Sequence, residues 1–91
     1  MPENILFCVS DCWTQFRIVR ATDAYSAVHK VHTRKTYKQI QPEMLTEQTV
    51  IHVMCCEYNG LNKEYLDRCT NDVDRVLLMD TFIDTLHYQI I

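Results

Sequence analysis

The most regular hydrophobic pattern in the chain lies in residues 71–90. Apolar side chains recur there at alternating spacings of three and four residues: Val76, Met79, Ile83, Leu86 and Ile90. Such spacing places side chains on one face of an α-helix. The pattern therefore predicts a long C-terminal helix, which would span about 30 Å at about 1.5 Å per residue.

Three other segments have the pattern of β-strands, and one more has that of a helix. Residues 5–9 are a short apolar run, residues 15–20 alternate in part, and residues 49–58 are rich in β-branched and bulky side chains. Thr22 is a good N-cap for a helix that extends to about Thr36. The apolar positions of this helix follow a helical spacing: Ala24, Ala27, Val28 and Val31.

A further helix is expected over residues 63–69, with Asn62 as its N-cap. Asn71 and Asp72 then repeat the features of a helix start. We therefore expect a break or kink near Thr70, although one continuous helix over residues 62–90 remains the alternative.

The expected order is strand, strand, helix, strand, helix, helix, which is typical of a single α+β domain over residues 1–91. We expect a three-stranded, mainly antiparallel sheet with strand order 3-1-2 and the first strand at its centre. The helix over 22–36 and the long C-terminal helix should cover one face of this sheet. The residues expected in the core are Ile5, Phe7, Ala24, Ala27, Val28, Val31, Ile51 and Val53.

The predicted C-terminal helix is longer than the strands, which at about six residues each would span roughly 20 Å. Its apolar face is therefore larger than one sheet face can cover, and this surplus predicts a protein partner, most simply a second copy in a two-fold dimer. A tryptophan in the expected hairpin loop is another candidate contact, because tryptophan dominates many interfaces. The predicted partner-binding residues are Trp13, Leu78, Phe82, Leu86 and Ile90.

The formal net charge is -3, but the positive charges are concentrated in one part of the sequence. Between residues 17 and 38 there are six bases and one acid. An alternative function is therefore a basic patch for nucleic acid, although nucleic-acid-binding proteins are usually net basic. The candidate contacts are Arg17, Arg20, Lys30, Arg34, Lys35 and Lys38.

The chain has five cysteines and four histidines. The odd number of cysteines and the lack of a secretion signal predict free thiols in the cytoplasm. Cys8 and Cys12 resemble half of a zinc motif, but no second close pair follows, so we expect no metal. No catalytic or cofactor-binding motif is present, and we expect a protein that is not an enzyme and needs no cofactor.

The sequence from Phe16 to Val31, FRIVRATDAYSAVHKV, resembles a stretch found in small phage-encoded proteins. In those proteins a strand passes through a Thr/Asp cap into a helix with alanines facing the sheet. The resemblance is to small inhibitors of host machinery, including anti-CRISPR proteins. It implies a non-enzymatic protein that occludes a host complex and acts in the host cytoplasm.

Overall fold

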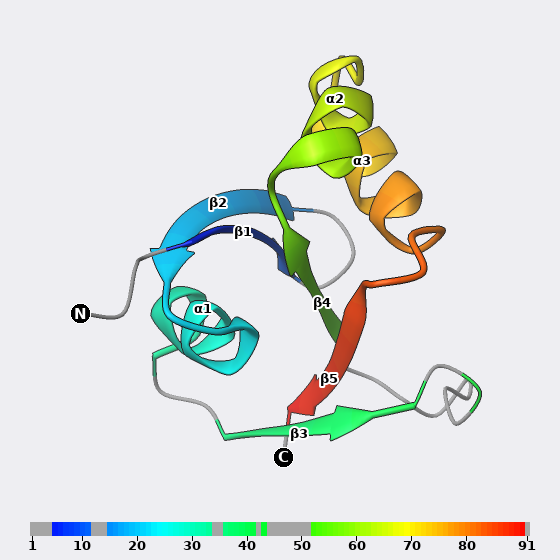
Figure 1. Cartoon of the computed structure of the whole chain (residues 1–91). Coiled ribbons are helices and arrows are strands. Elements are labelled where there is room, and N and C mark those ends of the chain that lie inside the picture. Colours follow the sequence, from blue (N-terminus) through cyan, green and yellow to red (C-terminus); the bar gives the residue numbers. More distant parts are fainter. Residues whose placement is uncertain (1–4, 12–14, 34–35, 42, 44–51, 91) are drawn as a thin grey trace.

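The computed structural model describes residues 5–11, 15–33, 36–41, 43 and 52–90. These residues form a single five-stranded sheet and three helices that pack against it (Figure 1). The elements are β1 (Ile5–Asp11), β2 (Gln15–Ala21), α1 (Ala24–Val31), β3 (Tyr37–Ile40), β4 (His52–Glu57), α2 (Gly60–Asp67), α3 (Asp72–Met79) and β5 (Leu86–Ile90). The strand order is β2-β1-β4-β5-β3, and every neighbouring pair is antiparallel.

The α+β class is confirmed, and the predicted three-stranded arrangement is one part of the observed sheet. β1 pairs with β2 on one side and with β4 on the other, which is the expected 3-1-2 order. The prediction of only three strands is wrong. β5 pairs with the free side of β4, and β3 pairs with β5.

The prediction of a long C-terminal helix is also wrong, because α3 ends at Met79 and the chain returns to the sheet as β5. The Thr85 hydroxyl donates to the Met79 carbonyl at 2.7 Å and satisfies a backbone acceptor that further helix would have used. Leu86 and Ile90 are four residues apart. That spacing puts two side chains on the same face of a helix and also on the same face of a strand, so it does not distinguish the two. The expected break near Thr70 is confirmed.

Three helix boundaries differ from the predictions. α1 begins after Asp23 rather than Thr22, because Asp23 Oδ1 accepts the Ser26 N–H at 2.8 Å. α1 ends at Val31, whereas the helix was expected to extend to about Thr36. Residues Tyr37–Ile40, for which no strand was predicted, form β3. α2 begins at Gly60, so Asn62 lies inside the helix and does not cap it.

α1 lies on one face of the sheet, and α2 and α3 lie on the other (Figure 1). Only one covered face was expected. Both faces are covered because β4 is apolar on each of them. Val53 and Cys55 belong to the core beneath α1. Met54 and Cys56 belong to a second core beneath α2 and α3.

Most of the predicted core is confirmed. Phe7, Ala27, Val28 and Val53 are buried in the core beneath α1. Three other predicted residues are partly buried against the same core: Ile5, Ala24 and Val31. Ile51 lies outside the described residues.

The cap of α3 gives a prediction for stability. The Asn71 side chain accepts the Asp74 N–H at 2.9 Å, whereas Asn59, at the same position of α2, makes no capping bond with its side chain. We expect Asn71→Ala to lower the free energy of unfolding by about 1 kcal/mol. Asn59→Ala is the matched control and should lower it by clearly less. Urea denaturation measures both, and an equal loss in the two variants would contradict this account of the cap.

Candidate functional site

A cavity of about 400 Å³ opens between the start of α1, the end of β4 and the loop that leads into β5. Apolar side chains from four elements line much of it: Ile5, Phe7, Ala24, Cys55 and Leu86. Burial raises the pKa of the Cys55 thiol, which therefore stays protonated and behaves as a small apolar side chain. The cavity thus offers an apolar surface on which the Cys55 thiol is not a ready nucleophile.

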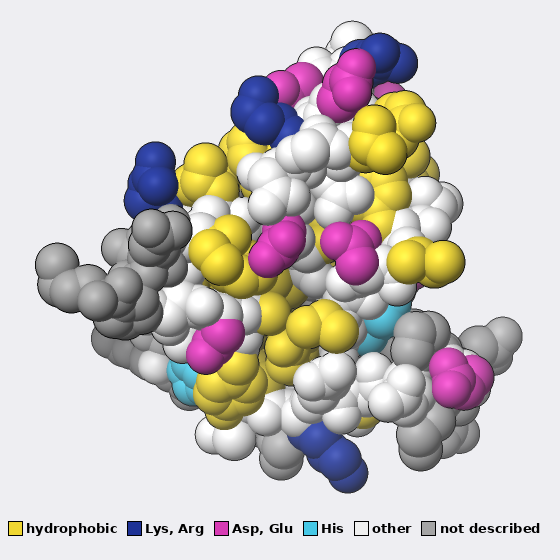
Figure 2. All heavy atoms as spheres, in the orientation of Figure 1, with side chains coloured by type: hydrophobic (Ala, Val, Ile, Leu, Met, Phe, Trp, Pro, Cys, Tyr) yellow, Lys and Arg dark blue, Asp and Glu magenta, His cyan; other side chains and the backbone are white. Residues whose placement is uncertain are grey.

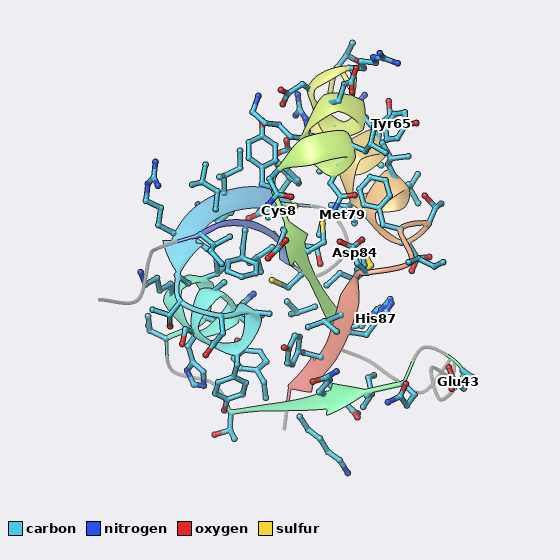
Figure 3. The ribbon with its side chains drawn as sticks, viewed as in Figure 1. Cys8, Glu43, Tyr65, Met79, Asp84 and His87 are labelled. Carbon is cyan, nitrogen blue, oxygen red and sulfur yellow. The ribbon has the colours of Figure 1, made fainter. Side chains whose placement is uncertain are left out.

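Three carboxylates line the same cavity, and each comes from a different segment of the chain. Asp23 caps α1, Glu57 ends β4, and Asp84 lies just before β5. Figure 2 shows acidic side chains around a hydrophobic area on this face, and Figure 3 places Asp84 there. The cavity therefore combines an apolar lining with negative charge.

The side chain of Asn62 helps to hold this arrangement. Its Nδ2 atom donates to Asp84 Oδ2 at 3.0 Å and to the Glu57 carbonyl oxygen at 3.1 Å. The first turn of α2 is thereby tied to the end of β4 and to the loop before β5. Asn62 therefore joins the two backbone segments that carry Glu57 and Asp84, two of the three carboxylates.

The cavity carboxylates are not neutralised by the basic residues that the structure describes. Within those ranges the ion pairs are Lys63–Asp67, Arg68–Glu64 and Arg75–Asp72, all on α2 and α3 or the turn between them. The Ser26 backbone N–H holds the pKa of Asp23 below its usual range, so this carboxylate remains charged at neutral pH. The arrangement therefore suits a cation that carries an apolar stem.

Exposed apolar side chains lie along α2 and α3 and in the loop before β5. Ile83 is fully exposed beside Asp84, and Leu61 is exposed beside Asn62. The exposed apolar positions of α2 and α3 are four residues apart in each helix: Leu61 and Tyr65, and Val73 and Leu77. Figure 2 shows hydrophobic side chains over these helices, and Figure 3 shows Tyr65 pointing away from the sheet.

The described residues that were predicted to bind a partner lie in other positions than expected. Leu78 and Phe82 are partly buried against the core beneath α2 and α3, and Leu86 is partly buried against the core beneath α1 and lines the cavity. Ile90 pairs with Tyr37 in the sheet. Trp13 and the side chain of Ile90 lie outside the described residues. The exposed apolar residues named above were missed, because the assumed helix placed the free surface further along the chain.

The described candidate nucleic-acid contacts do not lie at one edge of the sheet. Arg17 and Arg20 lie on β2, and the Lys30 ammonium on α1 donates to the Arg20 carbonyl. Lys38 lies on β3, at the opposite edge of the sheet from β2. The other two candidates, Arg34 and Lys35, lie outside the described residues.

Two buried histidines face each other across β4 and β5. His52 Nε2 lies 2.7 Å from His87 Nδ1, and the two rings are stacked. Burial lowers the pKa of both, that of His52 to about 4, while the charge of Asp80 opposes the shift. Among the described residues, no group of three or more His, Cys, Asp or Glu side chains could hold a metal ion.

Comparisons with family models, curated proteins and solved structures found no match for this chain. The resemblance to small phage inhibitors therefore stays a prediction. No helix within the described ranges is long and apolar enough to cross a membrane.

The histidine pair predicts a loss of stability in mild acid. The pKa of His52 falls from 6.5 to about 4 on folding, so the unfolded chain binds more protons than the native state between these values. Stability should therefore fall as the pH drops from 7 to 5, by about 2 kcal/mol for His52.

Urea denaturation at a series of pH values measures this slope. His52→Gln should flatten it, whereas His29→Gln on α1 should leave most of it in place. If wild type and His52→Gln lose stability in parallel between pH 7 and pH 5, the buried pair does not titrate as described.

Proposed function

We propose that this chain is a non-enzymatic protein-binding module. Its cavity receives a lysine or arginine side chain of the partner, and exposed apolar residues of α2, α3 and the loop before β5 contact the partner's surface. The single observation that carries the proposal is the apolar cavity lined by three carboxylates, Asp23, Glu57 and Asp84, without a described basic neighbour in an ion pair.

A long basic side chain has the two properties that this cavity complements. Its methylene groups can be buried against the apolar lining while its charged end stays near the carboxylates. Charge-assisted hydrogen bonds to a carboxylate are stronger than those between neutral groups. The exposed Leu61 and the fully exposed Ile83 lie next in sequence to Asn62 and Asp84 but do not line the cavity, so the partner would cover them with surface outside the cavity.

The narrower prediction of an inhibitor that occludes a host complex is compatible with this mode of binding and remains untested. Self-association also remains a prediction, but the surface for it changes. The exposed apolar positions of α2 and α3 replace the C-terminal helix that was expected to form the dimer.

Nucleic-acid binding is the less favoured alternative. The described bases among its candidate contacts lie on opposite edges of the sheet, and the cavity carries negative charge that repels phosphate. Both features favour a basic protein partner over a nucleic acid.

The cavity can be tested with n-butylammonium, which reproduces the end of a lysine side chain. We expect amide chemical shifts around Phe7, Ala24 and Leu86 to move on titration, with a dissociation constant of about 1–10 mM for so small a ligand. n-Butanol has the same apolar stem without the charge and should bind at least about tenfold more weakly. The double variant Glu57→Gln, Asp84→Asn should lose the difference between the two probes.

Glu64→Gln is the control, because Glu64 pairs with Arg68 on α2 and does not line the cavity. Selection from a random displayed peptide library then tests protein recognition itself. We expect selected peptides with lysine or arginine next to apolar residues, and the double variant should not select them. Equal binding of butanol and butylammonium, or selected peptides without basic residues, would contradict the proposed function.

A further inference from the structure

Two buried cysteines lie directly opposite each other on neighbouring strands. Cys8 of β1 is the register partner of Cys56 of β4, and their sulfur atoms are 3.0 Å apart. Cys8 is 0% exposed and Cys56 is 3% exposed. Figure 3 shows Cys8 near Met79, within the core beneath α2 and α3.

We propose that Cys8 and Cys56 are a modification site, a dithiol that hydrogen peroxide converts into a cross-strand disulfide. The inference is independent of the proposed binding function. It rests on the register of the two strands and on the position of the two sulfur atoms.

The backbone geometry at this position permits the bond. The Tyr58 N–H donates to the Leu6 carbonyl at 2.8 Å, and Cys8 and Cys56 are two positions further along the same antiparallel ladder. They therefore occupy a hydrogen-bonded position, where Cα atoms are about 5.5 Å apart. Disulfides span Cα separations of about 4.4–6.8 Å, so closing the bond requires sulfur movement of about 1 Å and little movement of the backbone.

The other described thiols are less suited to pair with either sulfur atom. Cys55 belongs to the core on the opposite face of the sheet and approaches the Ala24 carbonyl. Cys69 lies after α2, where its thiol donates to the Tyr65 carbonyl at 3.7 Å. Cys8 and Cys56 are thus the pair that the fold itself brings together among the described cysteines.

The reaction needs one equivalent of peroxide, a molecule small enough to enter a transient opening. Cys56 is the slightly more exposed residue and reacts first: its thiolate attacks one peroxide oxygen, the O–O bond breaks, and a sulfenic acid and hydroxide form. The Cys8 sulfur then attacks Cys56 Sγ, the S–O bond breaks, and water leaves. In total two thiols and one peroxide give one disulfide and two waters, so the thiols lose two electrons and the peroxide gains them.

Burial and the hydrogen bond between the two thiols make the reduced pair slow to react. The hydrogen bond to Cys56 and burial raise the pKa of Cys8, which keeps its thiolate scarce at neutral pH. Once formed, the disulfide would be shielded from thiol reductants by the same core.

The test treats the full chain with hydrogen peroxide, blocks remaining thiols after denaturation, and maps peptides by mass spectrometry. We expect a peptide that joins Cys8 to Cys56 with the loss of two hydrogens. The oxidised chain should also melt roughly 10 °C or more above the reduced chain, because the bond closes a long loop of the unfolded state. Cys8→Ala should abolish both effects, and Cys69→Ala is the control that should keep them.

The assignment does not depend on the folding of Cys8→Ala, because the joined peptide is identified in the wild-type chain. Recovery of Cys8 and Cys56 as blocked free thiols, under conditions that oxidise Cys69, would overturn the proposal. So would a disulfide that joins either residue to a different cysteine.

Discussion

β4 is buried on both faces of the sheet, and the elements next to it either cover one of its faces or pair with one of its sides. Its residues from His52 to Cys56 are all buried, and successive side chains point to opposite faces of the sheet. Each face therefore needs its own cover, and α1 supplies one while α2 and α3 supply the other. β4 also needs a strand on each side to satisfy its backbone, and β1 and β5 provide them.

The pairing of β5 with β4 links this constraint to the candidate site. β5 starts at Leu86, which pairs with Cys55 of β4, so Asp84 lies beside the end of β4. Asp84 there lines the cavity that Glu57 and Asp23 also line. Helix capping supplies the third carboxylate, since Asp23 is placed by its bond to the Ser26 N–H. A cavity with an apolar lining and three charges is thus a consequence of where three elements begin or end.

Sequence patterns revealed the elements whose local composition is distinctive. β1, β2 and β4 were found from their apolar and β-branched residues, and the start of α3 from Asn71. β5 was missed because the spacing of Leu86 and Ile90 suits both a strand and a helix. β3 has only four residues and depends on β5, which follows it by some 45 positions in the chain, so no local pattern could indicate it. The cavity was missed for the same reason, since its carboxylates come together only after β5 is placed in the sheet.

Residues 86–90 form a strand between β4 and β3, and the whole arrangement of the sheet requires this placement. Backbone NMR measures this directly. We expect strand-type chemical shifts over residues 86–90 and nuclear Overhauser effects from the backbone of Tyr88 to the backbones of Val53 and Gln39, its register partners. Helical chemical shifts that continue from α3 through residue 90, with no such contacts to β4 and β3, would contradict the account.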